Sequence, residues 1–263
     1  METTWSSSGT ARPDPGAPSP NAGVVTDPRL DPSTAEELEA AGWRYLSEWA
    51  EQQVGSTLRP ELRTERPGRD QRGLTLLGEC GFLQERVLWV MEAAVAAERV
   101  DARPGPAGLV IHPAADPRDV YAVMRDGFAG AWGFEAMTFE AFLTSRSGAP
   151  GHDPALWFLA TVDGRAVGAM TVFPAAPERS AMQLGELAVM PAERRRGVAT
   201  ALLHHAFDVT RAAGLRVLYL FADSDSADDA PGLYRSVGFE VVQSSVLLVA
   251  PLPLRHLVRD KPA

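Results

Sequence analysis

The chain has 263 residues, of which 45% are hydrophobic and 22% charged, so it can bury the core of one large or two modest domains. This composition argues against disordered, fibrous and repeat-only proteins. The formal net charge of −9 argues against nucleic acid as a partner and is compatible with a cationic small molecule or peptide as substrate. No run approaches the roughly 18 apolar residues of a membrane-spanning helix, so we predict a cytoplasmic protein with no membrane partner.

Cysteine and histidine usage gives no support for a metal centre. Cys80 is the single cysteine, which excludes an internal disulfide and a cysteine-based zinc cluster. The five histidines show no ligand pattern, and the adjacent pair His204 and His205 would face different ways on a helix. We therefore expect no metal cofactor. Arginine supplies all but one of the basic residues, which is typical of a GC-rich bacterial coding sequence.

The first hundred residues divide into a polar tail and a short ordered segment. Residues 1–32 are rich in Pro, Gly, Ser, Thr and Asp and predict a disordered tail. Ser33 with Glu36 forms a capping-box pattern that predicts a helix ending near Gly55. An extended piece at 57–64, a helix at 71–80 and a strand at 86–91 follow within a region 33–101. Residues 102–108 predict a linker.

From residue 109 to about 252, strands and helices alternate and predict one α/β domain, followed by a C-terminal tail at 253–263. A turn at Asp163-Gly164 predicts a hairpin, and Gly214 is a good C-terminal helix cap. The predicted strands lie at 109–111, 156–162, 167–173, 182–189 and 215–222, with a closing antiparallel pair at 239–243 and 246–250. The predicted helices lie at 117–128, 138–145, 197–213 and 228–236. A mixed, mostly antiparallel sheet flanked by helices follows, which excludes a simple doubly wound fold.

A basic loop between a strand and a helix is the most informative segment. The strand ends at Pro191, three consecutive arginines lead to Gly197, and a helix begins at once. Small residues let a ligand approach the backbone, while the free amides and positive dipole end of the first helical turn favour an anionic diphosphate. The spacing is neither the Walker pattern nor the three-glycine dinucleotide fingerprint. The alternative is a solvated loop, because arginines are mostly exposed.

Together with a second motif, this loop resembles the GCN5-related N-acetyltransferase family. The family's pyrophosphate loop, Gln/Arg-x-x-Gly-x-Gly/Ala, is matched by Arg194, Gly197 and Ala199. Its Leu-Tyr-x-x-x-Gly-Phe motif near the end is matched from Leu233 to Phe239. The resemblance covers residues 109 to about 250 and implies the acyl-CoA acyltransferase fold with acetyl-CoA as cosubstrate.

The resemblance also implies roles for individual residues. The strand before the loop would bind the pantetheine arm through its backbone, with the Val189 amide as oxyanion donor. Glu186, which strand alternation places on one face with Ala188 and Met190, is the candidate base, and Tyr234 is the candidate general acid. The implied cosubstrate-binding residues are Leu187, Ala188, Val189, Arg194, Arg195, Arg196, Gly197, Val198, Ala199 and Thr200.

Each of these side chains also has a structural interpretation. Glu186 could be an exposed strand residue or a simple anchor for an ammonium group, and Tyr234 could be a half-buried core residue. Aromatic residues in or beside the two early helices could line the acceptor side or belong to the core: Trp132, Phe134, Phe139 and Phe142. One departure from the family is Ala227, which stands where many members have an asparagine that contacts coenzyme A, and Asp228 or Asp229 is the candidate substitute.

An internal repeat links the two parts of the chain. Leu76 to Phe82 has the spacing of Leu233 to Phe239, with Leu77 in the place of Tyr234, and an apolar strand follows each. The alternative is that any helix closing on glycine before a strand looks similar. Within the family resemblance, the repeat implies a tandem arrangement in which residues 33–101 are a degenerate, truncated copy without the phosphate loop.

The sequence thus predicts an N-acetyltransferase that acts by direct attack of a primary amine of a small molecule or peptide on acetyl-CoA. A homodimer is compatible with this prediction. The alternative from another class is a non-catalytic coenzyme-A-binding or scaffold module that retains the fold without turnover.

Overall fold

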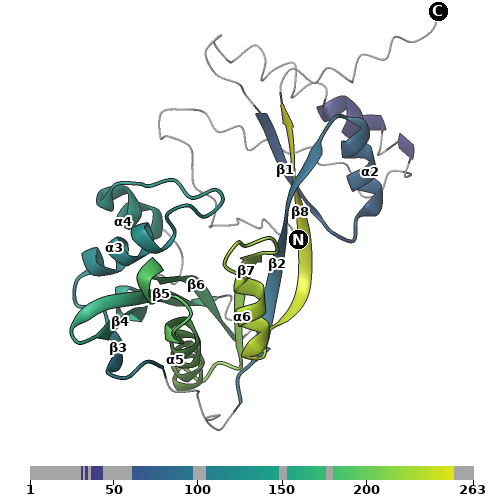
Figure 1. Cartoon of the computed structure of the whole chain (residues 1–263). Coiled ribbons are helices and arrows are strands. Elements are labelled where there is room, and N and C mark those ends of the chain that lie inside the picture. Colours follow the sequence, from purple (N-terminus) through teal and green to yellow (C-terminus); the bar gives the residue numbers. More distant parts are fainter. Residues whose placement is uncertain are drawn as a thin grey trace, which may run out of the picture. The chain divides into compact units, whose positions relative to one another are not determined.

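A computed structural model of the chain describes residues 31, 33–34, 37–43, 61–96, 105–147, 153–175 and 180–251. Eight strands within these residues form a single sheet of order β1-β8-β2-β7-β6-β5-β4-β3 (Figure 1). The strands are β1 (Glu61–Pro67), β2 (Leu83–Ala94), β3 (Leu109–Pro113), β4 (Trp157–Val162), β5 (Arg165–Ala175), β6 (Ala181–Val189), β7 (Val217–Asp223) and β8 (Glu240–Pro251). The predicted mixed fold, mostly antiparallel and flanked by helices, is confirmed.

Five α-helices have bounds within the described residues: α2 (Gln71–Glu79), α3 (Pro117–Gly127), α4 (Phe139–Ser147), α5 (Val198–Ala212) and α6 (Ala230–Ser236). Residues 37–43 are helical as well. At the first helical residues described, 33–34, Asp31 accepts the backbone amides of Ser33 and Thr34 at 3.1 Å. The prediction of Ser33 as the N-cap was therefore wrong, because Asp31 caps the first turn. Glu36 and the predicted end of this helix near Gly55 lie outside the described residues, as do most of the two predicted tails.

Two compact units make up the structure. The first contains Val90–Ala222 and Ser226–Val242, and the second contains the described residues up to Trp89, Asp223–Asp225 and the described residues from Gln243 on. β2 begins in the second unit and ends in the first, whereas β8 begins in the first and ends in the second. Each unit has its own apolar core.

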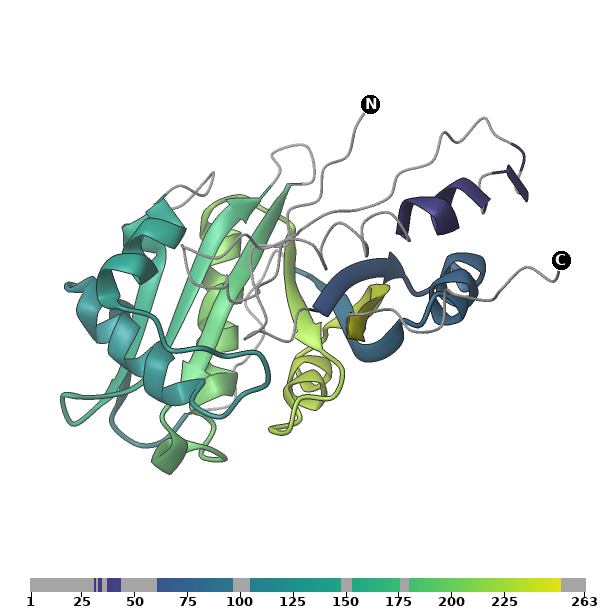
Figure 2. The same cartoon turned by 90° about the horizontal axis from the view of Figure 1, so that it is seen from above.

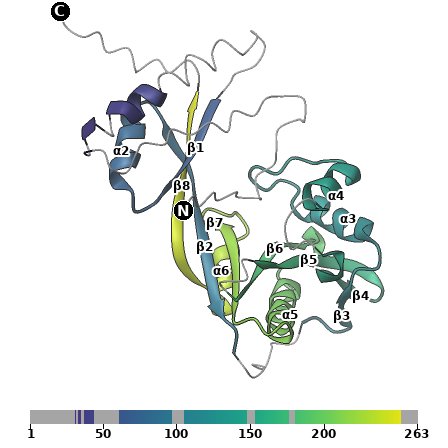
Figure 3. The ribbon, with the colours of Figure 1, turned by 180° about the vertical axis from the view of Figure 1, so that it is seen from behind.

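The first unit places helices on both faces of β3 to β6. On one face, Val123 of α3 is buried with Ala169 of β5 and Ala188 of β6. On the other face, Gly168 of β5 lies against Leu202 of α5. Figures 1 and 3 show α3 and α4 on one side of these strands and α5 on the other. This three-layer arrangement fixes the face on which each side chain of β6 emerges.

The predicted hairpin of β4 and β5 is confirmed. Val162 pairs with Arg165 across a two-residue turn in which Asp163 has φ 49° and Gly164 has φ 76°. Left-handed backbone at both turn residues matches the right-handed twist of the strands, and aspartate followed by glycine is a residue pair that adopts it readily.

Gly168 allows α5 to approach the sheet closely. A Cβ at this position would lie 2.9 Å from Val198 Cγ1 and 3.2 Å from the Ala188 carbonyl oxygen. Gly168→Ala should therefore lower the free energy of unfolding by about 1 to 3 kcal/mol through overpacking, measured by urea denaturation. Val110→Thr, at an exposed position of β3, should change it by less than about 0.5 kcal/mol. Equal effects of the two substitutions would contradict this packing argument.

The second unit contains β1, α2, the first part of β2 and the later part of β8. β1 pairs antiparallel with β8 from Glu61 opposite Pro251 to Pro67 opposite Ser245, and Figure 2 shows the two strands side by side in blue and yellow. Its core contains Trp43, Leu77, Cys80, Phe82, Val246, Leu248 and Ala250. Apolar residues of the predicted helix at 71–80 therefore pack into or against this core.

The predicted closing pair at 239–243 and 246–250 was wrong, because β8 runs unbroken from Glu240 to Pro251. The intervening residues Ser244 and Ser245 are polar but are not turn formers like glycine or asparagine. Ser245 instead pairs with Pro67 of β1, and the carbonyl oxygen of Ser244 accepts the Gly68 amide at 2.8 Å. A strand partner far away in the sequence thus continues the strand through this polar segment.

Candidate active site

The two halves of β6 have different neighbours. Along β5 the pairing continues as far as Val189, but along β7 it covers only Ala181, Met182 and Gln183. The parallel ladder therefore ends at Gln183, and the β7 side of the rest of β6 has no strand partner in that ladder. Backbone groups on this side are available to a ligand.

A β-bulge marks the point where the ladder ends. Thr171 of β5 pairs with Glu186 and the next residue pairs with Leu184, so Gly185 is the extra residue. A Cβ at Gly185 would lie 2.8 Å from both Phe173 Cε1 and Thr171 Oγ1. Glycine is thus required for these side chains to pack here.

Strand alternation settles which amides of β6 face its open edge. The Met190 amide donates to the Val167 carbonyl oxygen on the β5 side at 2.9 Å, so the amides of Leu187 and Val189 face the opposite side. The side chain of Ala188 lies in the core formed with α3, and Met190 packs against the same core. The predicted shared face of Glu186, Ala188 and Met190 is confirmed, because Glu186 contacts α4 on that side.

The chain passes from β6 through a short 3-10 turn, Pro191–Glu193, into α5. Gly197 is the N-cap of α5 at φ 88°, and no side chain caps the helix. The first helical bond is donated by Ala201 to the Gly197 carbonyl oxygen at 3.0 Å. The amides of Val198, Ala199 and Thr200 therefore have no helical acceptor, which makes this end of α5 suited to an anion.

The three arginines of the loop differ in their partners. Arg194 donates to Asp228 at 3.0 Å and to the Gly127 carbonyl oxygen at 2.7 Å. Arg196 forms an ion pair with the buried Glu193. Arg195 has φ 62° and an exposed side chain that makes no ion pair with any described residue. Two of the three guanidinium groups therefore hold the loop, and Arg195 is available to a ligand.

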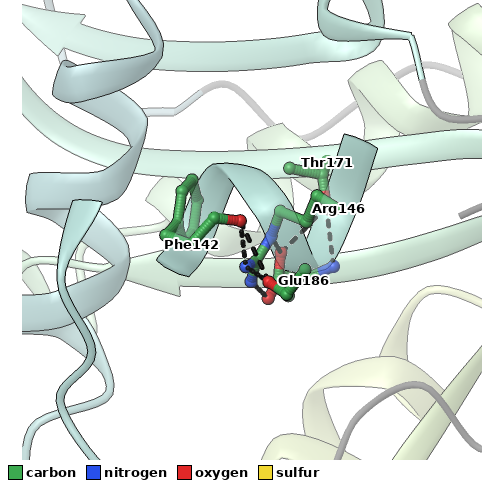
Figure 4. A network of polar contacts seen from close by, with 5 residues as sticks. Phe142, Arg146, Thr171 and Glu186 are labelled. Atoms are coloured by element: carbon green, nitrogen blue, oxygen red, sulfur yellow. Dashed lines mark hydrogen bonds and ion pairs between the residues drawn. The ribbon is translucent and has the colours of Figure 1, made fainter. Parts of the chain in front are cut away.

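Glu186 lies in a polar network that joins α4, β5 and β6 (Figure 4). Arg146 of α4 binds both of its carboxylate oxygens, with Nε 3.1 Å from Oε2. Thr171 accepts the Glu186 amide at 3.1 Å and donates its hydroxyl to Oε2 at 3.3 Å. The carboxylate is therefore held in one orientation by two neighbouring elements.

The sequence analysis missed both partners of Glu186 in this network, Thr171 and Arg146. The guanidinium group of Arg146 lies 3.7 Å from the centre of the Phe142 ring, and burial lowers its pKa to about 10, so it stays charged at neutral pH. An arginine in the last turn of a helix is common, because its positive charge interacts favourably with the negative end of the helix dipole. No local signal connects it to a glutamate forty residues later.

Tyr234 lies in α6 and is half-buried beside Phe239, with ring centres 5.9 Å apart. Burial raises the pKa of its phenol to about 12. Its hydroxyl makes no hydrogen bond to any residue that the structure describes. The phenol therefore keeps its proton near neutral pH.

The aromatic residues in or beside α3 and α4 divide between core and surface. Phe142 is buried and packs edge-on against Trp157 at 5.5 Å, whereas Trp132 is exposed. Phe142 thus belongs to the core. Of the two aspartates near Ala227, Asp228 binds Arg194 and Asp229 caps α6 by accepting the Gly232 amide at 3.2 Å.

The described residues contain no group of three or more His, Cys, Asp or Glu side chains that could hold a metal ion. None of the helices among them is long and apolar enough to cross a membrane.

Comparisons with known proteins agree on one family. Residues 118–239 match the model of the acetyltransferase (GNAT) family. The mycothiol acetyltransferase of Clavibacter michiganensis subsp. michiganensis (strain NCPPB 382) is 30% identical over 222 residues, which are 82% of this chain and 69% of that protein. A GCN5-related N-acetyltransferase from Sphaerobacter thermophilus superposes with a TM-score of 0.71 at 25% identity, covering 85% of this chain and 70% of the other. A tandem GNAT protein from the clavulanic acid biosynthesis pathway shares the fold, with a TM-score of 0.57 at 14% identity over 81% of this chain and 70% of the other.

Proposed function

Because the chain belongs to the GNAT acetyltransferase family, we propose that it transfers the acetyl group of acetyl-CoA to a primary amine of a small molecule or peptide. The observation that carries this proposal is the sequence of two features along the chain. The open edge of β6 is followed, after one short loop, by the uncapped N-terminus of α5. An extended thioester arm and a diphosphate need these two features in this order. The proposal includes a cytoplasmic location, where acetyl-CoA is available, and is compatible with a homodimer.

The residues present fit acetyl-CoA as cosubstrate, which supplies an activated acetyl group as its thioester. Leu187 and Val189 offer backbone groups to the pantetheine arm, while Ala188 keeps the strand packed on α3. The diphosphate would lie at the first turn of α5, bound by the amides of residues 198–200 and by the side chain of Arg195. Arg194 and Arg196 would not bind the diphosphate themselves. Their contacts with Asp228 and Glu193 would hold the loop in the shape that presents these amides.

Acetyl transfer needs a neutral amine, a donor for the oxyanion and a proton for the leaving thiolate. Glu186 is the proposed base that takes the proton of the amine, directly or through water. The amine nitrogen then bonds to the carbonyl carbon and the carbon–sulfur bond breaks. The Val189 amide is the proposed oxyanion donor, and Tyr234 is the proposed acid that protonates the sulfur.

We also propose that the segment 33–101 is a degenerate copy of the acetyltransferase half-domain. In support, α2 and α6 end in the same turn: Gly81 has φ 89° and Gly238 has φ 98°. The Phe82 amide donates to the Leu77 carbonyl oxygen at 2.9 Å, and the Phe239 amide donates to the Tyr234 carbonyl oxygen at 3.1 Å. Because Leu77 is apolar, this copy has no acid in the position of Tyr234.

A non-catalytic coenzyme-A-binding module is the second candidate, favoured by one observation. The Glu186 carboxylate is engaged by Arg146 on both oxygens, so neither oxygen is free of the guanidinium group to take the proton of an amine. The two candidates make different predictions for thiol release.

The deciding experiment measures acetyl-CoA binding by calorimetry and thiol release across a panel of amines with the full chain. Binding together with amine-dependent release, and an N-acetylated product detected by mass spectrometry, supports the transferase. Binding without release from any amine supports the module. Absence of binding to acetyl-CoA and to its desulfo analogue contradicts both candidates.

A further inference from the structure

Several contacts hold the guanidinium group of Arg146 in place. Besides the two oxygens of Glu186, it donates through one terminal nitrogen to the Phe142 carbonyl oxygen at 3.2 Å and to Ser145 Oγ at 3.1 Å. The Phe142 ring supports its flat face. An arginine with this much support keeps its planar fork in place when its carboxylate partner changes, because the hydrogen bonds to α4 do not depend on that partner.

Glu186 is equally well supported without Arg146. Its side chain starts at the bulge of β6, and Thr171 binds both its backbone amide and one carboxylate oxygen. The side-chain exposed fractions of Arg146 and Glu186 are 18% and 29%. The pair is thus partly open, with a fixed cation and a fixed anion side by side at the proposed base.

A pair of this kind matches a ligand that carries both charges. An α-amino acid presents a carboxylate and an ammonium group on one carbon, so it can take Arg146 with the first and Glu186 with the second. A simple amine that displaces Arg146 from Glu186 leaves the charged guanidinium group without its carboxylate. Such an unpaired, partly buried charge is costly.

Apolar groups lie next to the pair. Phe173 is close enough to Gly185 that a Cβ there would be 2.8 Å from its ring, and Thr171 shares that contact. The ring is therefore a neighbour of the residue that orients Glu186. An acceptor with an aromatic or large aliphatic side chain would find a matching surface here.

We propose that the acceptor is an amino acid whose carboxylate lies beside its amine, and that Arg146 is the residue that selects it by exchanging Glu186 for the acceptor's carboxylate. This inference rests on the proposed function. The exchange also gives Arg146 and Glu186 different tasks in turnover. It releases the Glu186 carboxylate from the guanidinium group at the moment when the amine arrives, so the base becomes available only with the correct acceptor.

The test compares three probes that differ in one group: L-phenylalanine, L-phenylalaninamide and phenethylamine. With the wild-type protein saturated with acetyl-CoA, kcat/KM for L-phenylalanine should exceed that for the other two by about 10- to 100-fold. In Arg146→Gln this preference should vanish, with the loss confined to the carboxylate-bearing probe. Arg146→Lys, which keeps the charge without the fork, should retain part of the preference.

A matched control is Arg125→Gln, because Arg125 is an exposed arginine of α3 paired with its neighbour Asp126 at 2.7 Å. Its removal should leave the preference unchanged. Equal rates for all three probes in the wild type, or an equal loss for all three in Arg146→Gln, would overturn the proposal.

Calorimetry with the coenzyme-A-saturated protein separates this inference from the proposed function. It measures the binding of the same three probes without turnover. Tighter binding of L-phenylalanine that is lost in Arg146→Gln supports carboxylate recognition even when no probe is acetylated, in which case the transferase proposal alone fails. Equal binding of all three probes, or binding of none, refutes the role of Arg146 whatever the turnover.

Discussion

Gly197→Glu should weaken the binding of acetyl-CoA by at least about 100-fold, because it places negative charge and bulk where the diphosphate is proposed to lie. Gly197 is the N-cap of α5 at φ 88° and no side chain competes for the amides behind it. The added carboxylate would cap these amides itself and repel the phosphates. Isothermal titration calorimetry with acetyl-CoA measures the effect.

The opposite end of the same helix provides the control. Gly214 follows α5 with φ 72° and open space around it, so Gly214→Glu introduces a similar backbone strain and the same charge. A helix of 15 residues separates the two positions by about 22 Å at 1.5 Å per residue. Gly214→Glu should therefore bind acetyl-CoA almost as the wild type does. Similar affinities of the two variants would mean that the loop before α5 is not the diphosphate site.

Tyr234→Phe should lower kcat by roughly 10- to 100-fold, which is the usual scale for the loss of a general acid. The affinity for acetyl-CoA should stay nearly constant, because the Tyr234 hydroxyl contributes no hydrogen bond to any described residue and the ring keeps its contact with Phe239. Steady-state kinetics of thiol release, together with calorimetry, separates the two effects. Unchanged turnover would remove Tyr234 from the mechanism.

The pH profile adds a second check on Tyr234. Burial raises the pKa of this phenol to about 12, so the proton needed by the leaving thiolate remains on the oxygen over the whole neutral range. Turnover of the wild type should not fall through loss of this proton below about pH 10. A fall in turnover near pH 8 that disappears in Tyr234→Phe would contradict this assignment.

Tyr121→Phe is the matched phenol control. Tyr121 donates its hydroxyl to the Met137 carbonyl oxygen at 2.7 Å, so this substitution should cost about 1 kcal/mol of stability and little turnover. A loss of turnover equal to that of Tyr234→Phe would assign both effects to folding.

Local elements and the strand–loop–helix at residues 182–213 could be predicted from the sequence because their signals are local. Asp163-Gly164 specifies its turn by backbone preference, and alternation places Glu186 and Ala188 on one face. The continuous strand β8 could not be predicted, because Ser244 and Ser245 are held in it by residues nearly 180 positions earlier. Pairing between residues so far apart in the sequence leaves no periodic pattern in either segment.

The candidate site shows the same division. The spacing of Arg194, Gly197 and Ala199 marks the loop, but it cannot tell which arginine is bound by the protein itself. That distinction depends on Asp228 and Glu193, and on the position of α3 beside the loop. Arg146 was missed for the same reason, since its meaning comes from the packing of α4 over β6.

The pairing of β1 with β8 has a consequence for how this chain folds during its synthesis. Pro67 leaves the exit tunnel long before Pro251, the last residue of its partner strand. At about 5 to 20 residues per second, this delay is roughly 10 to 40 s. Throughout that time the nascent β1 has an exposed edge that other strands can join. β1 therefore stays unpaired with β8 until nearly all of the described chain has been synthesised.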